Sequence, residues 1–130
     1  MFKDYKRWMT LKITVNNVAG HPFFHEREIW YCYLGENVGF EQDGKGDLFM
    51  RPIIVLRKFN QEIFWGLPLT STLKSSKYYS VVDFGLGKKS SVILSQIRLI
   101  DAKRLSHKIG VVSEEEFDNL VIKKFKALLP

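Results

Sequence analysis

The sequence GFEQDGKGDLFMRPIIVL, residues 39–56, joins a polar, glycine-containing segment to a run of apolar residues. Gly44 and Gly46 permit backbone angles that are closed to other residues, so we expect a loop there. Pro52 fixes its own φ and favours an extended conformation for Arg51, and the apolar run that it opens predicts a buried strand. A guanidinium at the entrance of a strand is suited to grip a phosphate or a carboxylate. A surface loop that precedes a core strand is the commoner explanation of such a stretch and stays open at this point.

The composition indicates one globular domain with a basic surface. The chain has 130 residues, of which 45% are hydrophobic and 14% aromatic, enough to build a packed core. Its formal net charge is +6 and its pI about 9.5, which favours an anionic partner, either nucleic acid or an acidic protein. No apolar run approaches the ~20 residues that span a bilayer, and the charged N-terminus lacks the apolar core of a signal peptide. We therefore expect a cytoplasmic protein with no membrane partner.

The residue types of metal and thiol chemistry are sparse. Cys32 is the single cysteine, which excludes an internal disulfide, and packing on a sheet face is a commoner role for it than nucleophile. His21, His25 and His107 lack the spacing of a metal site, so we expect no metal and no cofactor. A two-histidine ribonuclease would require distant histidines to converge in the fold and remains an alternative.

The hydrophobic pattern of the remaining sequence predicts short strands with a helix at each end of the chain. Strands are predicted at residues 28–34, 52–57, 63–69, 78–82, 91–99 and 109–112. An amphipathic helix is predicted within residues 1–17, one helical turn at 101–105 with Asp101 as its cap, and a C-terminal helix that starts at Ser113 with a capping box. The fold class is therefore mainly β. The whole chain is one domain, with an N-terminal helical arm (1–25), a small barrel (26–112) and a C-terminal helix (113–130).

Polar residues mark the ends of several predicted strands. Arg51 opens the second strand, Thr70 and Ser71 close the third, and Gln96 and Arg98 close the fifth, after Ser95. Strand ends and loops commonly form the working face of a small barrel. Turn chemistry would also explain Thr70 and Ser71, and a solvated strand end would explain Gln96 and Arg98.

Five segments in a fixed order carry a family resemblance. They are Arg27-Glu28-Ile29-Trp30, the loop with Glu41-Gln42, Arg51-Pro52 before Ile53-Ile54-Val55-Leu56, Leu67-Pro68-Leu69-Thr70-Ser71, and Ser91 to Arg98. Together they resemble the MazF/PemK family of toxins from type II toxin–antitoxin systems. The resemblance covers about Arg27 to Leu120, most of the chain.

This resemblance implies an SH3-like barrel of five to seven strands, a homodimer, and metal-independent endoribonuclease activity on single-stranded RNA or mRNA. It also implies a cognate antitoxin, usually with an acidic, partly disordered tail. The family's catalytic arginine and threonine correspond to Arg51 and Thr70, and its loop glutamine to Gln42. Its QIR segment corresponds to Gln96 and Arg98. The sequence departs from the family pattern in a longer loop between Gln42 and Arg51 and in an additional arm before Arg27, and we expect both to bear on substrate preference and antitoxin docking more than on the chemistry.

Further residues are expected to bind the substrate. Lys45, Lys74 and Lys77 are candidates for contacts with the RNA backbone. Phe40 and Phe49 are candidates for base stacking, with loop packing as the alternative. Ser71, beside Thr70, completes the expected substrate-binding residues, together with Gln42, Gln96 and Arg98.

Two non-catalytic functions compete with the nuclease. Toxins of the same barrel fold bind a protein such as DNA gyrase, which would place the function in the C-terminal helix and make Arg51 dispensable. An RNA-binding barrel without cleavage is the other alternative.

Overall fold

The computed structural model describes residues 22–34, 50–85 and 87–130. The predicted N-terminal helix lies outside these residues. So do Phe40, Gln42, Lys45 and Phe49, the loop positions that were expected to bind the substrate.

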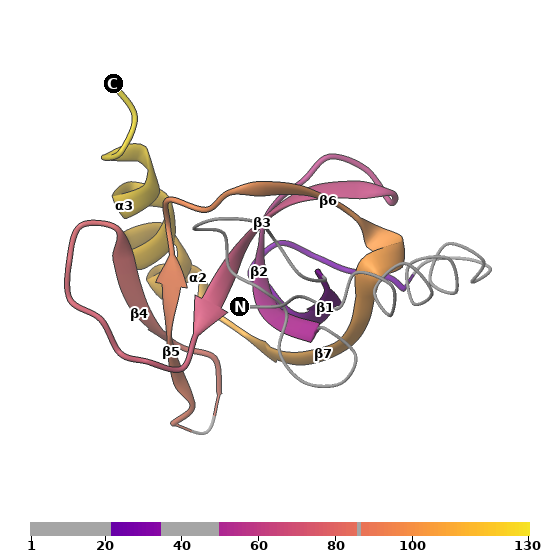
Figure 1. The fold of residues 1–130 in the computed structure, drawn as a ribbon, viewed down its shortest axis with the longest axis horizontal. Helices are drawn as coiled ribbons and strands as arrows, with labels where there is room; N and C mark the ends of the chain where they lie inside the picture. The colour runs from indigo at the N-terminus through magenta and orange to yellow at the C-terminus, as the bar shows by residue number, and fades with distance from the viewer. Residues whose placement is uncertain (1–21, 35–49, 86) are drawn as a thin grey trace, which may run out of the picture.

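The described chain folds into antiparallel strands that curl into a barrel, with a helix at the C-terminal end (Figure 1). The strands are β1 (Glu28–Tyr33), β2 (Met50–Lys58), β3 (Ile63–Thr70), β4 (Tyr79–Asp83), β5 (Lys89–Ile93), β6 (Arg98–Asp101) and β7 (Leu105–Val111). Their order is β4-β5-β3-β2-β1-β7, and β6 pairs with β3. The predicted mainly β architecture is confirmed.

The strand predicted at residues 91–99 is wrong in one respect, because the chain breaks it in two. β5 ends at Ile93, the N–H of Gln96 donates to the Ile93 carbonyl at 3.2 Å in a turn, and β6 begins at Arg98. β5 pairs with the end of β3, at Leu69 and Thr70, whereas β6 pairs with its beginning, residues 63–66. Two partners share one edge of β3, so the chain must turn between them.

β2 begins earlier than predicted, so Arg51 lies inside the strand and not at its entrance. Met50 and Arg51 already pair with Tyr33 and Cys32 of β1. Proline lacks an N–H, and it is tolerated where the ladder does not need one. Pairing of β2 with β3 starts only at Ile53, one residue after Pro52. The proline therefore fits just outside that ladder.

The two helical predictions near the C-terminus are confirmed in position. Residues Ala102–Arg104 form a 3₁₀ turn, and the Asp101 carboxylate accepts the Lys103 N–H at 2.9 Å. β7, predicted from 109, already starts at Leu105. The helix cap at Ser113 is also confirmed, because its hydroxyl accepts the Glu116 N–H at 3.2 Å.

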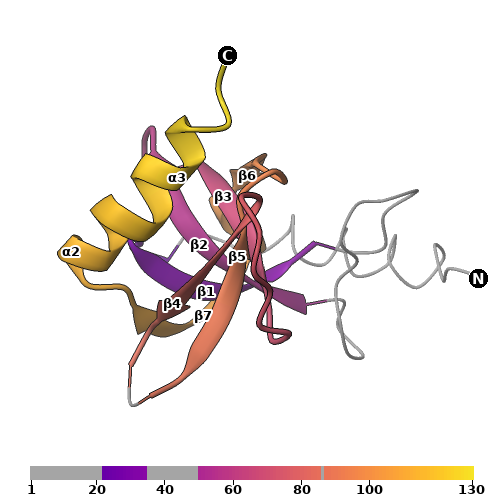
Figure 2. The same cartoon turned by 90° about the vertical axis from the view of Figure 1, so that its left-hand side faces the viewer.

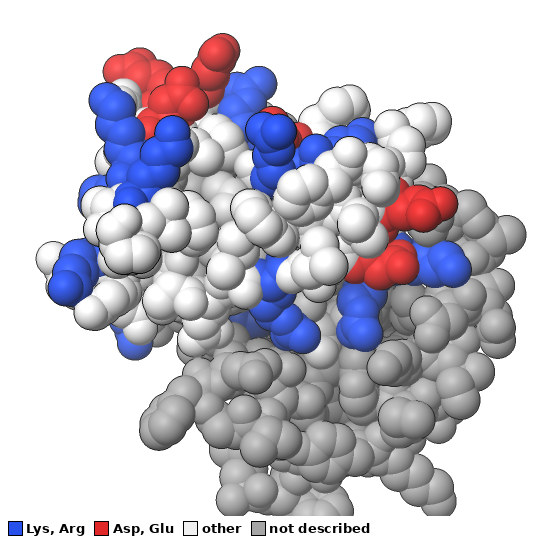
Figure 3. All heavy atoms as spheres, turned by 90° about the horizontal axis from the view of Figure 1, so that it is seen from above, with Lys and Arg blue, Asp and Glu red and all other residues white. Residues whose placement is uncertain are grey.

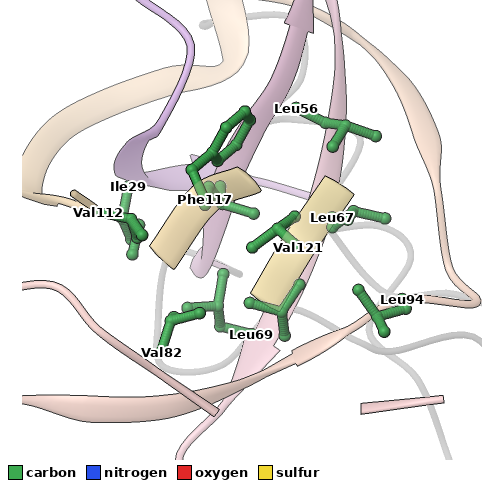
Figure 4. Close-up of a cluster of buried hydrophobic side chains, with 11 residues drawn as sticks. Ile29, Leu56, Leu67, Leu69, Val82, Leu94, Val112, Phe117 and Val121 are labelled. Atoms are coloured by element: carbon green, nitrogen blue, oxygen red, sulfur yellow. The ribbon is translucent and has the colours of Figure 1, made fainter. Parts of the chain in front are cut away.

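The C-terminal helix runs through α2 (Glu114–Glu116), a π-helical stretch (Phe117–Ile122) and α3 (Lys123–Lys126). Figure 2 shows it lying against one side of the strands. Phe117 and Val121 point from the helix into a buried cluster that the strands complete (Figure 4). This first core contains Ile29, Leu56, Leu67, Leu69, Val82, Leu94 and Val112 among its members.

A second core lies on the other face of β1, β2 and β3. Successive side chains of a strand point to opposite faces. Ile54 and Leu56 therefore join the first core, whereas Ile53 and Val55 join the second, together with Cys32 and Phe64. Both faces of β2 are buried, which explains its continuous apolar sequence.

Glu28 is a carboxylate buried at the start of β1. It accepts hydrogen bonds from the indole N–H of Trp30 (3.0 Å) and the backbone N–H of His25 (2.8 Å). The ammonium group of Lys108 on β7 lies 3.1 Å away. Burial by itself raises the pKa of Glu28, but these bonds and the Lys108 charge outweigh it, and the pKa lies below its ordinary value.

We expect Glu28→Leu to lower the free energy of unfolding at pH 7 by about 1–3 kcal/mol, because it leaves the buried Trp30 N–H without its acceptor. Glu28→Gln keeps an acceptor and should lose less. A depressed folded-state pKa gives stability that is full above the ordinary value of 4.5 and is lost as the pH falls through the folded value. Urea unfolding between pH 7 and pH 3 measures both. Equal stability of the Leu variant and the unmodified protein would contradict this account.

Cys32 lies fully buried in the second core. Burial raises the pKa of its thiol to about 12, although the charges of Arg104 and Arg98 act in the opposite direction. The structure therefore supports a packing role for Cys32 and not a role as a nucleophile.

We expect the folded protein to resist a thiol reagent at pH 8, because the Cys32 thiol is both inaccessible and protonated there. Mass spectrometry after treatment with a maleimide should show no adduct until a denaturant is added. Stoichiometric labelling of the folded protein within minutes would overturn this assignment.

Candidate active site

Strand register places Arg51 and Thr70 on one face of the sheet. Ile53 of β2 is paired with Pro68 of β3, and directly paired residues point to the same face. Two residues further along each strand are Arg51 and Thr70. Extension of the register by two residues beyond this last pair assigns both to the face of Ile53, opposite each other.

Arg51 is buried at this position. Its strand partner is the buried Cys32, and its own side chain is 1% exposed. A buried guanidinium on a central strand loses little freedom when it binds an anion. Leu34, two residues beyond Cys32, continues the same buried face at the end of β1.

Thr70 closes β3 and is partly exposed. It pairs with Ser91 of β5, and its hydroxyl lies 3.4 Å from the N–H of Thr72, which donates to it. The Ser91 hydroxyl accepts the Lys74 N–H at 2.9 Å, which fastens the following loop to β5. Ser71 is the exposed residue that begins this loop.

A hollow of about 430 Å³ opens near the ends of β1 and β3, and neither Arg51 nor Thr70 is among its lining residues. Leu34, just after β1, and Pro68 of β3 line one side of it. Ser95 to Leu99 form the remaining wall, so Gln96 and Arg98 both line this hollow. Two of the residues expected to bind the substrate are therefore brought together by the segment that joins β5 to β6.

Arg104 is a further cation in this region that the sequence analysis did not single out. Its guanidinium donates to the Tyr33 carbonyl at the end of β1, at 3.0 Å. Burial lowers the pKa of Arg104, and the nearby charge of Arg98 lowers it further. The basic residue in the predicted turn at 101–105 was a usable signal, but only the fold shows that this turn lies at the end of β1.

Lys74 and Lys77 do not line the hollow of Gln96 and Arg98. They lie in a second hollow of about 510 Å³, formed by the loop after β3, by β4 and by Lys124 of α3. The predicted substrate-binding residues thus divide between two sites, one on each side of the end of β3.

The described histidines are engaged separately. The His25 ring lies 3.3 Å from the Glu28 carboxylate, and the His107 ring packs against Tyr31, with 5.0 Å between ring centroids. Within residues 22–34, 50–85 and 87–130, no three His, Cys, Asp or Glu side chains come together as a metal site would require.

Comparison with known proteins agrees with this architecture. The sequence model of the PemK-like, MazF-like toxins of type II toxin–antitoxin systems matches residues 25–127. A search of curated proteins finds no match. Among the helices of the described residues, none is long and apolar enough to cross a membrane.

Solved structures show the same fold. MazF from Deinococcus radiodurans superposes with a TM-score of 0.66 at 21% identity, covering 85% of this chain and 97% of that one. The Mycobacterium tuberculosis toxin MazF-mt6 superposes with a TM-score of 0.59 at 18% identity, covering 78% and 94%. An endoribonuclease in complex with its cognate antitoxin, from a mycobacterial species, gives 0.54 at 11% identity, covering 80% and 88%.

The matched region spans most of the chain, and the antiparallel sheet with its C-terminal helix is the fold of the solved structures that it resembles. The chain belongs to the PemK-like, MazF-like toxins of type II toxin–antitoxin systems.

Proposed function

We propose that this toxin is an endoribonuclease that cleaves single-stranded RNA without a metal ion. Arg51 and Thr70 would act together on the scissile phosphate. Family membership and two neighbours described as endoribonucleases support the reaction class. The observation that supports the residue assignment is the β2–β3 register, from whose extension we infer that the buried Arg51 and the Thr70 hydroxyl lie on one face of the sheet.

In this proposal the RNA supplies its own nucleophile. The ribose 2′-hydroxyl loses its proton to solvent, and its oxygen forms a bond to phosphorus. The bond between phosphorus and the 5′-oxygen breaks, and that oxygen takes up a proton from solvent. The products are a 2′,3′-cyclic phosphate and a 5′-hydroxyl end, so DNA is not a substrate.

Arg51 stabilises the negative charge that grows on the non-bridging oxygens. A guanidinium keeps its proton at neutral pH, so it serves as a fixed positive charge and not as a proton donor. Its two parallel N–H groups match two phosphate oxygens. Because the side chain is already ordered, little reorganisation is needed when the charge develops.

Thr70 orients the phosphate or the 2′-hydroxyl by a hydrogen bond from its own hydroxyl. The side-chain oxygen accepts the Thr72 N–H, which leaves the O–H hydrogen available to donate. Gln96 and Arg98, which line the hollow next to Pro68 of β3, would hold the nucleotides next to the scissile bond.

We expect Arg51→Ala and Thr70→Ala each to lower the single-turnover rate of RNA cleavage by roughly 10²–10³, the usual cost of removing a preorganised donor. Thr70→Ser keeps the hydroxyl and should stay within about tenfold of the unmodified protein. The assay uses labelled single-stranded RNA in EDTA, with chemical analysis of the product ends.

The control is Arg57→Ala, which removes an exposed arginine from the other end of β2. It should cleave like the unmodified protein. An Arg51→Ala preparation that cleaves as fast as this control, with the same ends, would remove Arg51 from the mechanism. Intact RNA with every variant, combined with DNA breakage in cells, would instead favour a gyrase-directed toxin.

We further propose that the toxin is a cytoplasmic homodimer neutralised by an acidic antitoxin. Support comes from the net charge of +6 and from neighbours in complex with antitoxins, among them MazE–MazF from Deinococcus radiodurans (TM-score 0.53, 16% identity, covering 83% and 94%). Co-purification with a small acidic protein encoded beside this gene tests the partner.

A further inference from the structure

The second hollow, with Lys74 and Lys77, is separate from the site of Arg51 and Thr70. Its lining residues are Lys74, Ser75, Ser76, Lys77, Tyr79, Val81 and Lys124. They come from the loop between β3 and β4, from β4 and from α3. In Figure 1 this loop runs along the left edge of the molecule, below α3. Three cations from two distant parts of the chain thus converge on one hollow.

The charge of this hollow is of one sign. Among the described residues, no Asp or Glu lines it, and none of its three lysines takes part in an ion pair. Seen from above, the acidic side chains of the described surface gather mainly in two groups, at the upper left and at the right, while basic side chains also follow the left flank (Figure 3). An anion that enters the hollow therefore meets positive charge without a competing carboxylate from the described chain.

Aromatic rings hold two of these ammonium groups. The Lys74 ammonium lies 5.0 Å from the centre of the Tyr79 ring, and that of Lys77 lies 5.2 Å from the centre of the Tyr78 ring. Tyr78 is 45% exposed, so its ring is accessible to a base. Cations beside an accessible aromatic ring are the usual combination for binding single-stranded nucleic acid, where phosphates meet the charges and a base stacks on the ring.

The hollow is mechanically connected to the proposed cleavage site. The Lys74 N–H donates to the Ser91 hydroxyl at 2.9 Å, and Ser91 is the strand partner of Thr70. One strand spacing therefore separates Thr70 from the anchor of the lysine loop. The loop that lines the hollow therefore starts directly after the strand end that carries Thr70.

We propose that Lys74, Lys77 and Lys124 form a second binding surface for single-stranded RNA, which holds the phosphates of nucleotides outside the cleaved step. Lys124 of the C-terminal helix is the new element of this surface. The inference rests on the proposed function for the direction of the strand, but binding itself does not require cleavage. An acidic polypeptide fits less well, because a segment that orders on binding needs apolar anchors and the hollow offers chiefly ammonium and hydroxyl groups.

The test compares Lys77→Gln/Lys124→Gln with a control of equal charge, Lys88→Gln/Lys126→Gln. Lys88 and Lys126 are exposed, and neither lines the hollow. The probe is fluorescent 2′-O-methyl RNA of about 20 nucleotides, which lacks the attacking hydroxyl, and binding is followed by anisotropy over a range of salt concentrations.

Losing two phosphate contacts should reduce the slope of log affinity against log salt by about 1.4, and the affinity at 0.1 M salt by roughly tenfold. The control should keep the original slope. Loss of the same slope in both double variants would overturn the proposal, since it would show a general charge effect. Unchanged binding by the Lys77/Lys124 variant would overturn it as well.

A second readout separates this proposal from the nuclease itself. With cleavable RNA, the Lys77/Lys124 variant should lose roughly tenfold in kcat/KM on a substrate of about 20 nucleotides and little on one of about five. If the unmodified protein cleaves neither substrate, the proposed function fails while the binding result still decides the second surface. If a fluorescent polyglutamate peptide, and not RNA, depends on these lysines, the surface belongs to an acidic protein and the RNA proposal is wrong.

Discussion

Strand β3 is hydrogen-bonded along both edges, and the rest of the structure depends on how its second edge is divided. One edge pairs with β2, whereas the other pairs first with β6 and then with β5. Pro68, which has no N–H, lies between these two partners, where the second edge needs no bond. The change of partner forces a turn between β5 and β6, and Ser95 to Ile97 then form part of the wall of the hollow that Pro68 also lines.

The proposed site follows from this arrangement. Extension of the β2–β3 register assigns Arg51 and Thr70 to one face, and Gln96 and Arg98 line a hollow next to Pro68 of β3. Arg104 adds a third guanidinium near the end of β1. The charges of Arg104 and Arg98 also act on the buried thiol of Cys32 in the second core, where they partly offset the rise that burial causes in its pKa.

Sequence patterns predicted the elements whose signals are local. The run from Ile53 to Leu56 indicated a strand buried on both faces, and the cap at Ser113 indicated where the helix starts. The break at Leu94 to Ile97 could not be predicted, because VILSQIRL is apolar enough for one strand and only the competition of β5 and β6 for β3 divides it. The backbone conformation of Arg27 could not be predicted either. Its φ of 76° accompanies two hydrogen bonds to distant segments, since its N–H donates to the Val55 carbonyl and its carbonyl accepts the Val112 N–H.

The candidate site, like the fold, could be predicted from sequence only where the signal is local. The family resemblance, carried by the order of short motifs, indicated Arg51, Thr70, Gln96 and Arg98, whereas their position near strand ends also had ordinary explanations in turn chemistry and solvation. The separation of Lys74 and Lys77 from them, and the addition of Lys124 from a helix about fifty residues later, depend on tertiary packing alone.

A double-mutant cycle on Arg51 and Thr70, measured as single-turnover RNA cleavage, tests the central claim most directly. If the two groups act on one phosphate, the double alanine variant should be about as slow as Arg51→Ala alone. Losses that multiply would show that the two residues act independently and would contradict the account.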